Sequence, residues 1–107
     1  NLIDDGATIR ILDWEYAATG DPFFDLGTFA VNQGFTPAQR KRLLAAYLGA
    51  ASESDLARLD KFCVVSDLRE GFWGLAQAVL SRIDFDFIGY ADRHLKRALK
   101  TWNGKQK

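Results

Sequence analysis

The stretch ILDWEYAATGDPFFDLGTFAVNQGF, residues 11–35, decides how this chain is expected to fold. Four carboxylates lie among its aromatic and aliphatic residues, and they belong to Asp13, Glu15, Asp21 and Asp25. The nearest cation in the sequence is Arg10. Carboxylates in apolar surroundings need a cation, a helix N-terminus or another hydrogen-bonding partner to offset the cost of their charge. The flanking residues indicate which of these each carboxylate has.

A helix start signal occupies the second half of the stretch. Asp21 suits the N-cap position, Pro22 suits the first helical position, and Asp25 lies near the positive end of the helix dipole. Capping of this kind satisfies backbone N–H groups without any ligand. We therefore interpret Asp21 and Asp25 as structural residues that begin a helix.

A β-hairpin is predicted for the residues before this helix. Residues 4–6, Asp-Asp-Gly, supply a turn in which glycine tolerates positive φ, and residues 8–14 alternate with a period of two. Ile9 and Ile11 are expected to point inward. This leaves Asp13 at the inner edge of the sheet, where the strand ends.

Asp13 and Asn1 are candidate metal ligands. A buried carboxylate is costly unless it is hydrogen-bonded or bound to a metal, and Mg²⁺ prefers carboxylate and amide oxygens. Glu15 follows two residues later, so an extended backbone would turn it to the same side as Asp13, towards a cationic substrate. The residues alone leave an alternative open for each carboxylate. Asp13 could cap a neighbouring loop instead of binding a metal, and Glu15 could solvate the rim of a cleft instead of binding a substrate.

Three more helices are expected after the first. One begins with a capping-box pattern at Thr36 and Gln39, a long one spans residues 52–83, and the last lies within residues 84–102. The predicted apolar face of the long helix comprises Leu56, Leu59, Phe62, Cys63, Phe72, Leu75, Val79 and Leu80. One side of the last helix carries Phe87, Tyr90, His94 and Leu95.

The sequence therefore predicts an α+β fold that is mostly α. A hairpin with the candidate metal-binding aspartate is expected over residues 1–17, a subdomain of about four helices over residues 18–103, and a frayed tail over residues 104–107. At 107 residues, 48% of them apolar, the chain is long enough for one small domain and too short for two.

The segment EGFWGLAQA, residues 70–78, is unusual for a helix interior. Gly71 and Gly74 each cost about 0.8 to 1 kcal/mol relative to alanine, so a close approach of another backbone or a ligand is expected there. Trp73 and Tyr90 could form part of an aromatic box for a protonated or quaternary amine. The alternative is an ordinary aromatic core at a tight helix crossing.

The cysteine content and the hydropathy indicate a cytoplasmic protein. Cys63 is the single cysteine, so no internal disulfide can form, and its apolar surroundings predict a small buried hydrophobe in a reducing compartment. No apolar run approaches the ~20 residues of a membrane span, and no charged-then-apolar leader opens the sequence.

Basic residues are concentrated at the C-terminal end, although the formal net charge is zero. Lys96, Arg97 and Lys100 lie where the last turns of a helix favour positive charge, and we interpret them in this way rather than as a nucleic-acid or membrane patch. His94 is the only histidine and has no nucleophile or metal ligand at a suitable spacing, so a structural role is expected.

The segment NLIDDGATIRILDWEYAATGDPFFDLGTFAVN, residues 1–32, resembles the metal-binding segment of the choline/ethanolamine kinase and aminoglycoside phosphotransferase superfamily. That superfamily has a protein-kinase-like fold. Its pattern of a catalytic-loop Asn, an Ile-Asp-Trp/Phe-Glu-Tyr segment and an Asp-Pro-x-x-Asp-Leu segment is met by Asn1, residues 12–17 and residues 21–26. Residues 72–97 are similar to the C-terminal helices of choline-kinase-like proteins, so this chain is expected to be the C-terminal part of the C-lobe.

The resemblance implies roles for five residues. Asn1 and Asp13 would hold the Mg²⁺ that bridges to the phosphates of ATP. Glu15, Trp73 and Tyr90 match positions that surround the cationic head of choline. The same resemblance makes Asp25 structural.

One departure from the family pattern concerns the substrate. Ala76 stands where the better-known choline kinases have a second Trp. The aromatic box is thinner as a result, which leaves room for ethanolamine, thiamine or another amino alcohol. An aminoglycoside or thiamine kinase-like phosphotransferase is therefore the alternative within the superfamily.

The resemblance also places several family residues before Asn1, among them the catalytic aspartate, the Gly-rich loop and the lysine that clamps the nucleotide. The chain has no methionine. We therefore expect a C-terminal part of a longer ATP-dependent phosphotransferase, inactive without the missing N-terminal part. Two readings without catalysis stay open, a helical interaction domain and a pseudokinase.

Overall fold

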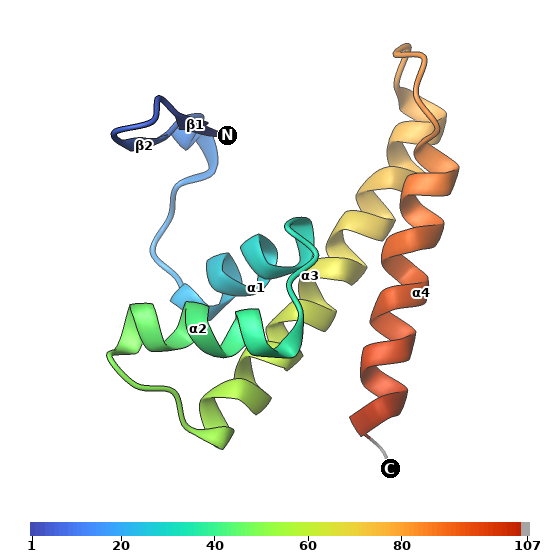
Figure 1. Ribbon diagram of the computed structural model, residues 1–107. Coiled ribbons are helices and arrows are strands. Elements are labelled where there is room, and N and C mark those ends of the chain that lie inside the picture. Colours follow the sequence, from blue (N-terminus) through green and yellow to red (C-terminus); the bar gives the residue numbers. More distant parts are fainter. Residues whose placement is uncertain (106–107) are drawn as a thin grey trace.

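The computed structural model describes residues 1–105 and confirms the predicted fold class. A two-stranded antiparallel hairpin and one 3₁₀ turn precede four α-helices (Figure 1). The elements are β1 (Leu2–Asp4), β2 (Ile9–Ile11), the 3₁₀ turn η1 (Trp14–Tyr16), α1 (Pro22–Asn32), α2 (Pro37–Leu48), α3 (Glu53–Leu80) and α4 (Phe87–Lys105). Residues 104 and 105 of the predicted frayed tail belong to α4, and residues 106–107 lie outside the described residues.

Helix α3 is the axis on which the other helices pack. Helices α1 and α2 lie beside its first half and α4 lies along its second half, so α3 joins two separate helix pairs (Figure 1). The hairpin is connected to α1 by an extended segment and stands apart from the α3–α4 pair. The candidate residues of the hairpin and of α3–α4 are therefore placed by different parts of the fold.

The predicted helix starts are confirmed. Asp21 caps α1, since its carboxylate accepts a hydrogen bond of 3.0 Å from the N–H of Phe23. This bond, and after it a hydrogen bond and ion pair with Arg58, hold the pKa of Asp21 below its ordinary value. The capping box of α2 is complete, because Gln39 N–H donates to the Thr36 hydroxyl and Gln39 Oε1 accepts from Thr36 N–H.

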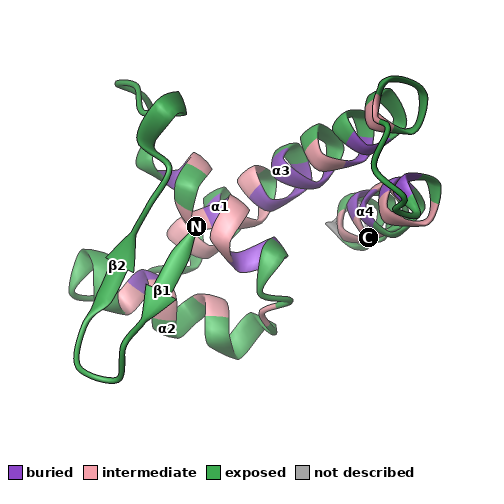
Figure 2. Cartoon of the chain, turned by 90° about the horizontal axis from the view of Figure 1, so that it is seen from above, coloured by how far each residue is buried: buried purple, intermediate pink, exposed green. Residues whose placement is uncertain are grey.

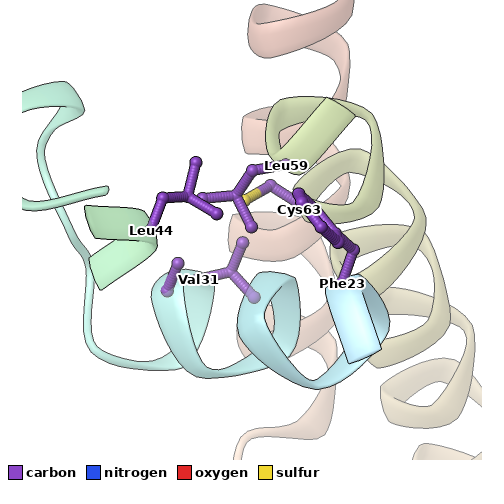
Figure 3. Close-up of a cluster of buried hydrophobic side chains, with 6 residues drawn as sticks. Phe23, Val31, Leu44, Leu59 and Cys63 are labelled. Atoms are coloured by element: carbon purple, nitrogen blue, oxygen red, sulfur yellow. The ribbon is translucent and has the colours of Figure 1, made fainter. Parts of the chain in front are cut away.

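The hydrophobic core lies where α1, α2 and α3 meet (Figure 3). Its buried members are Phe23, Ala30, Val31, Leu44, Leu59 and Cys63. Cys63 is 1% exposed, as predicted for a small hydrophobe, and burial raises the pKa of its thiol to about 11. Such a thiol stays protonated at neutral pH and packs as an apolar group.

Gly27 allows α1 and α3 to cross at close range. A Cβ at this position would lie 2.9 Å from the carbonyl carbon of Phe62 and 3.1 Å from the backbone nitrogen of Cys63. Backbone atoms cannot swing aside as a side chain does, so any residue larger than glycine would push the two helices apart.

Gly27→Ala is therefore expected to lower the free energy of unfolding by about 1–3 kcal/mol, the usual cost of overpacking. The loss would occur although alanine is the better helix former. Urea denaturation followed by circular dichroism measures it. Gly104→Ala in α4 is the matched control, because no neighbouring atom lies within 4 Å of a Cβ there. Equal stability of the two variants would contradict the close crossing.

The second half of α3 packs against α4 through small and polar residues. A Cβ at Gly71 would lie 2.6 Å from the Leu95 side chain and one at Gly74 would lie 2.9 Å from the Tyr90 ring. The close approach predicted from these glycines is confirmed. Figure 2 shows the buried positions of α3 and α4 facing each other.

The predicted apolar face of α3 is wrong in this second half. Phe72 is 62% exposed, Val79 is 85% exposed, and Leu75 and Leu80 are also exposed. The buried residues are Asp67, Gly71 and Gly74 instead. Only small side chains fit between helices this close together, so the large apolar residues project away from α4.

The prediction that Ile9 and Ile11 point inward is also wrong. The hairpin has the expected antiparallel register, with Leu2 opposite Ile11 and Asp4 opposite Ile9. Ile9 is 64% exposed and Ile11 is 55% exposed. Every residue of the hairpin is exposed, so no element among the described residues buries these two side chains.

Candidate functional site

The hairpin brings Asn1 and Asp13 together. The N–H of Leu12 donates a hydrogen bond of 2.9 Å to the carbonyl of Asn1, which extends the strand pairing by one step. Asn1 Nδ2 lies 3.1 Å from Asp13 Oδ2 and donates to it. The two predicted metal ligands, twelve residues apart in the sequence, are thus in direct contact.

Asp13 has an uncommon backbone conformation. Its φ of 66° and ψ of 61° lie in the left-handed region, and it is the one non-glycine residue with positive φ in the part of the chain that the structure describes. This conformation costs most L-residues about 1–2 kcal/mol, aspartate and asparagine tolerate it better than others, and such outliers cluster at functional sites. Asp13 is at the N-cap of η1, but its side chain makes no cap hydrogen bond. The alternative of a loop cap therefore finds no support in the geometry.

The Asn1–Asp13 pair offers hard oxygen donors to a cation. No group of three or more His, Cys, Asp or Glu side chains in residues 1–105 is arranged to hold a metal. Mg²⁺ commonly takes only one or two protein carboxylates and completes its octahedron with phosphate oxygens and water. One carboxylate and one amide oxygen fit this role, and they do not fit a metal site formed by protein ligands alone.

The prediction that Glu15 lies on an extended backbone is wrong. Residues 14–16 form the 3₁₀ turn η1, and the Trp14 indole Nε1 donates a hydrogen bond of 2.9 Å to the carbonyl of Ile11. The alternation of the strand therefore stops before Glu15, whose side chain is exposed. A turn of this kind changes the direction of each successive side chain by about a third of a revolution.

A hollow of about 830 Å³ opens between this turn and the helices α1 and α3. Asp13, Trp14, Asp25 and Phe62 are among the residues that line it, and Glu15 is not. Asp25 lies in the first turn of α1, where its charge favours the helix N-terminus as expected. The hollow is therefore an opening between the hairpin and the helices with carboxylates at its edge.

Trp73 and Tyr90 form the predicted aromatic pair. Their ring centroids are 5.8 Å apart at an interplanar angle of 72°, an edge-to-face arrangement. Trp73 is 49% exposed, so one part of its ring is open to a ligand. The Phe87 ring lies 5.9 Å from Trp73 and the Phe85 ring 6.1 Å from Tyr90. Phe87 was expected on the same side of the last helix as Tyr90, and Phe85 is an additional neighbour.

The phenol of Tyr90 donates a hydrogen bond of 2.5 Å to Glu70 Oε2. Burial, and then the hydrogen bond to this carboxylate, raise the pKa of Tyr90. Glu70 was missed as a site residue. Its signal in the sequence is a charged residue directly before Gly71, in the segment where the two glycines predict a close approach of another backbone or a ligand.

Asp67 is a second residue that the sequence analysis missed. It is 1% exposed and lies between α3 and α4. His94 Nδ1 lies 2.8 Å from Asp67 Oδ1, and Arg97 donates to both carboxylate oxygens. The Asp67 carboxylate raises the pKa of Arg97. His94 thus has the structural role expected of it, whereas Arg97 is an interhelical partner rather than only a last-turn cation.

The two predicted groups of site residues are not brought together. Within residues 1–105, no hydrogen bond, ion pair or ring contact joins Asn1, Asp13 or Glu15 to Trp73 or Tyr90. Figure 1 shows the hairpin on one side of the molecule and the α3–α4 pair on the other. The described chain therefore holds a polar pair at one place and an aromatic pair at another.

Comparison with known proteins supports the assignment from the motifs. "Probable choline kinase 3" of Arabidopsis thaliana is 27% identical over 123 residues, which cover 91% of this chain and 36% of that protein. The chain thus spans little more than a third of this relative. No solved structure matches it. Among the described residues, no helix is long and apolar enough to cross a membrane. Residues 1–62 match the family described as "Phosphotransferase enzyme family", so the chain belongs to this family, as the resemblance to choline/ethanolamine kinases and aminoglycoside phosphotransferases predicts.

Proposed function

We propose that this chain is the C-terminal portion of a small-molecule kinase that transfers the γ-phosphate of ATP to a hydroxyl of an amino alcohol such as choline or ethanolamine. The observation that carries the proposal is the contact of Asn1 with Asp13 at the left-handed position after the hairpin. Both residues lie within the part of the chain that matches the phosphotransferase family.

Asn1 and Asp13 act at the phosphate end of the reaction. Asp13 supplies a carboxylate and Asn1 an amide oxygen to Mg²⁺, which neutralises phosphate charge during phosphoryl transfer. The hairpin keeps the two side chains within 3.1 Å of each other before any ligand binds. The two residues are thus neighbours before the charged group arrives, with Asn1 Nδ2 rather than Oδ1 in contact with Asp13.

Trp73 and Tyr90 act at the amine end. An aromatic face attracts a cation that lies within about 6 Å of its centroid. Trp73 is half exposed and is held edge-to-face by Tyr90, so its ring is available to an ammonium or trimethylammonium group. The name of the similar Arabidopsis protein supports an amino alcohol as the substrate class. Glu15 is exposed on the turn that follows Asp13, apart from Trp73 and Tyr90, and its role at the cationic head rests on the family resemblance alone.

Other parts of the same protein complete the active site. The catalytic base and the residues that clamp ATP come from the N-terminal part that the family resemblance implies. The hairpin supports such a contact, because Leu2, Ile3, Ile9 and Ile11 are each between 47% and 64% exposed. Apolar side chains gathered on one small hairpin indicate a surface that another element covers.

A substrate panel on the full-length protein tests the proposal. With ATP and Mg²⁺, ADP release is expected to rise with choline or ethanolamine and to stay at background with kanamycin. Thiamine-dependent release would favour the thiamine kinase-like alternative, and kanamycin-dependent release the aminoglycoside alternative. If choline, ethanolamine, thiamine and kanamycin all leave ADP release at background, the result would favour a pseudokinase.

The isolated 107-residue chain is expected to show no amine-dependent ADP release under the same conditions. It lacks the base and the nucleotide-binding residues that the resemblance assigns to the N-terminal part. The coupled assay on the isolated chain, with the full-length protein as positive control, measures this. Turnover by the isolated chain would contradict the division of the active site between the two parts.

A further inference from the structure

We infer that Glu70 is a positioning residue that fixes the Tyr90 ring for cation binding by the Trp73–Tyr90 pair. The inference rests on the proposed amine site and assigns a role to a carboxylate that does not itself touch the amine. Three features of the α3–α4 contact carry it: the burial of Glu70, its hydrogen bonds, and the packing on the remaining sides of the ring.

Glu70 is a mostly buried carboxylate with both oxygens engaged. Its side chain is 13% exposed. Oε2 accepts the hydrogen bond of 2.5 Å from the Tyr90 phenol, and Oε1 is paired with the guanidinium of the neighbouring Arg69. A buried carboxylate is costly when its hydrogen bonds are lost, and bonds to charged groups are the strong ones. The phenol oxygen of Tyr90 is therefore held at a defined point.

The rest of the Tyr90 ring is held by packing. On the α3 side the ring packs closely against Gly74, where an added Cβ would lie 2.9 Å from Tyr90 Cδ1. The His94 ring lies with its centroid 4.5 Å from that of Tyr90. His94 is itself anchored by Asp67 at 2.8 Å. The ring is thus tethered at its hydroxyl and supported along its side.

A fixed ring orientation matters because the χ2 angle of an unrestrained tyrosine side chain has a broad distribution. A cation that lies over the exposed part of Trp73 gains from Tyr90 only when the Tyr90 ring is in place beside it, and an ordered ring pays no ordering cost on binding. The hydrogen bond also occupies the Tyr90 hydroxyl. Tyr90 therefore serves the amine through its ring, and Glu70 acts through Tyr90.

The test compares Glu70→Ala, Glu70→Gln and Tyr90→Phe in the full-length protein, with Glu53→Gln on the exposed first turn of α3 as control. Glu70→Ala is expected to raise the KM for choline or ethanolamine about tenfold, in line with loss of a hydrogen bond to a charged group. The KM for ATP should stay unchanged. Glu70→Gln keeps an acceptor oxygen and should recover most of the loss. The Glu53→Gln variant should match the wild type.

A double-mutant cycle separates positioning from a general structural effect. Once Tyr90→Phe has removed the hydroxyl, Glu70→Ala is expected to add less than twofold to the amine KM, because the two residues act through one bond. Additive effects, or equal changes in the KM values for amine and ATP, would overturn the inference. If turnover is too slow to fit, dissociation constants for choline from calorimetry replace KM.

Trp73→Ala distinguishes failure of this inference from failure of the proposed amine site. An amine KM that rises in Trp73→Ala but stays unchanged in Glu70→Ala keeps the site and removes the role of Glu70. An amine KM that is unchanged in both variants places the amine elsewhere and overturns both proposals.

Discussion

Asp13→Ala in the full-length protein is expected to lower kcat for phosphoryl transfer by about 10³-fold, the scale of losing one preorganised group that stabilises transition-state charge. The carboxylate of Asp13 is in contact with Asn1 and is the anionic member of the proposed metal pair. The loss of stability should not exceed about 1–2 kcal/mol, the cost of alanine in the left-handed backbone conformation, because the Asp13 side chain is exposed and caps nothing. The coupled ADP-release assay at saturating ATP and amine measures the effect.

Two controls sharpen this experiment. Asp13→Asn keeps a residue that tolerates the left-handed backbone, so its loss of turnover reports the charge and not the conformation. Asp4→Asn removes a carboxylate from the same hairpin, where Asp4 accepts a bond from the Gly6 N–H, and should leave turnover near the wild-type value. Unchanged turnover in both Asp13 variants would remove Asp13 from the metal site.

Asp67→Ala is expected to lower the free energy of unfolding by about 3 kcal/mol, the lower end of the cost of breaking a buried ion pair. The carboxylate is 1% exposed and serves both His94 and Arg97. Its loss would leave the His94 side chain, which is 10% exposed, without its carboxylate partner, while the Arg97 side chain at 35% exposure could turn to water. Urea denaturation followed by circular dichroism measures the change in midpoint and slope.

Asp92→Ala is the matched control for Asp67→Ala. Asp92 forms an ion pair of 2.7 Å with Lys96 on α4, but both side chains are at least half exposed. Solvent screening limits such pairs to less than about 0.5 kcal/mol. A loss in Asp67→Ala no greater than in Asp92→Ala would mean that the small-residue packing at Gly71 and Gly74, and not the ion pair, holds α3 to α4.

The parts of the fold predicted correctly are those that depend on neighbouring residues. Asp21 and the Thr36–Gln39 pair cap their helices as expected, because a cap is completed within four residues of chain. The Asn1–Asp13 contact follows from the hairpin register and was indicated by the family motif. Local chemistry and a short-range pairing were sufficient in each case.

The wrong predictions concern backbone direction and burial, which depend on how the elements pack against one another. Glu15 was expected on an extended strand, but β2 ends at Ile11 and Glu15 lies in the 3₁₀ turn that begins at Trp14. Phe72 and Val79 were expected in the core at helical spacing, but α4 packs so closely that glycines occupy the contact. Spacing identifies the positions that share a face of a helix, and the partner determines which face is buried.

By itself the sequence determined the order of the elements, the helix caps, the hairpin and the phosphotransferase family of residues 1–62. Only the tertiary structure decided that Asp67 lies between helices with His94 and Arg97, and that Glu70 meets Tyr90. These contacts join residues 20 to 30 positions apart. Their partners are chosen by how closely α3 and α4 approach, which is a property of packing and not of any local pattern.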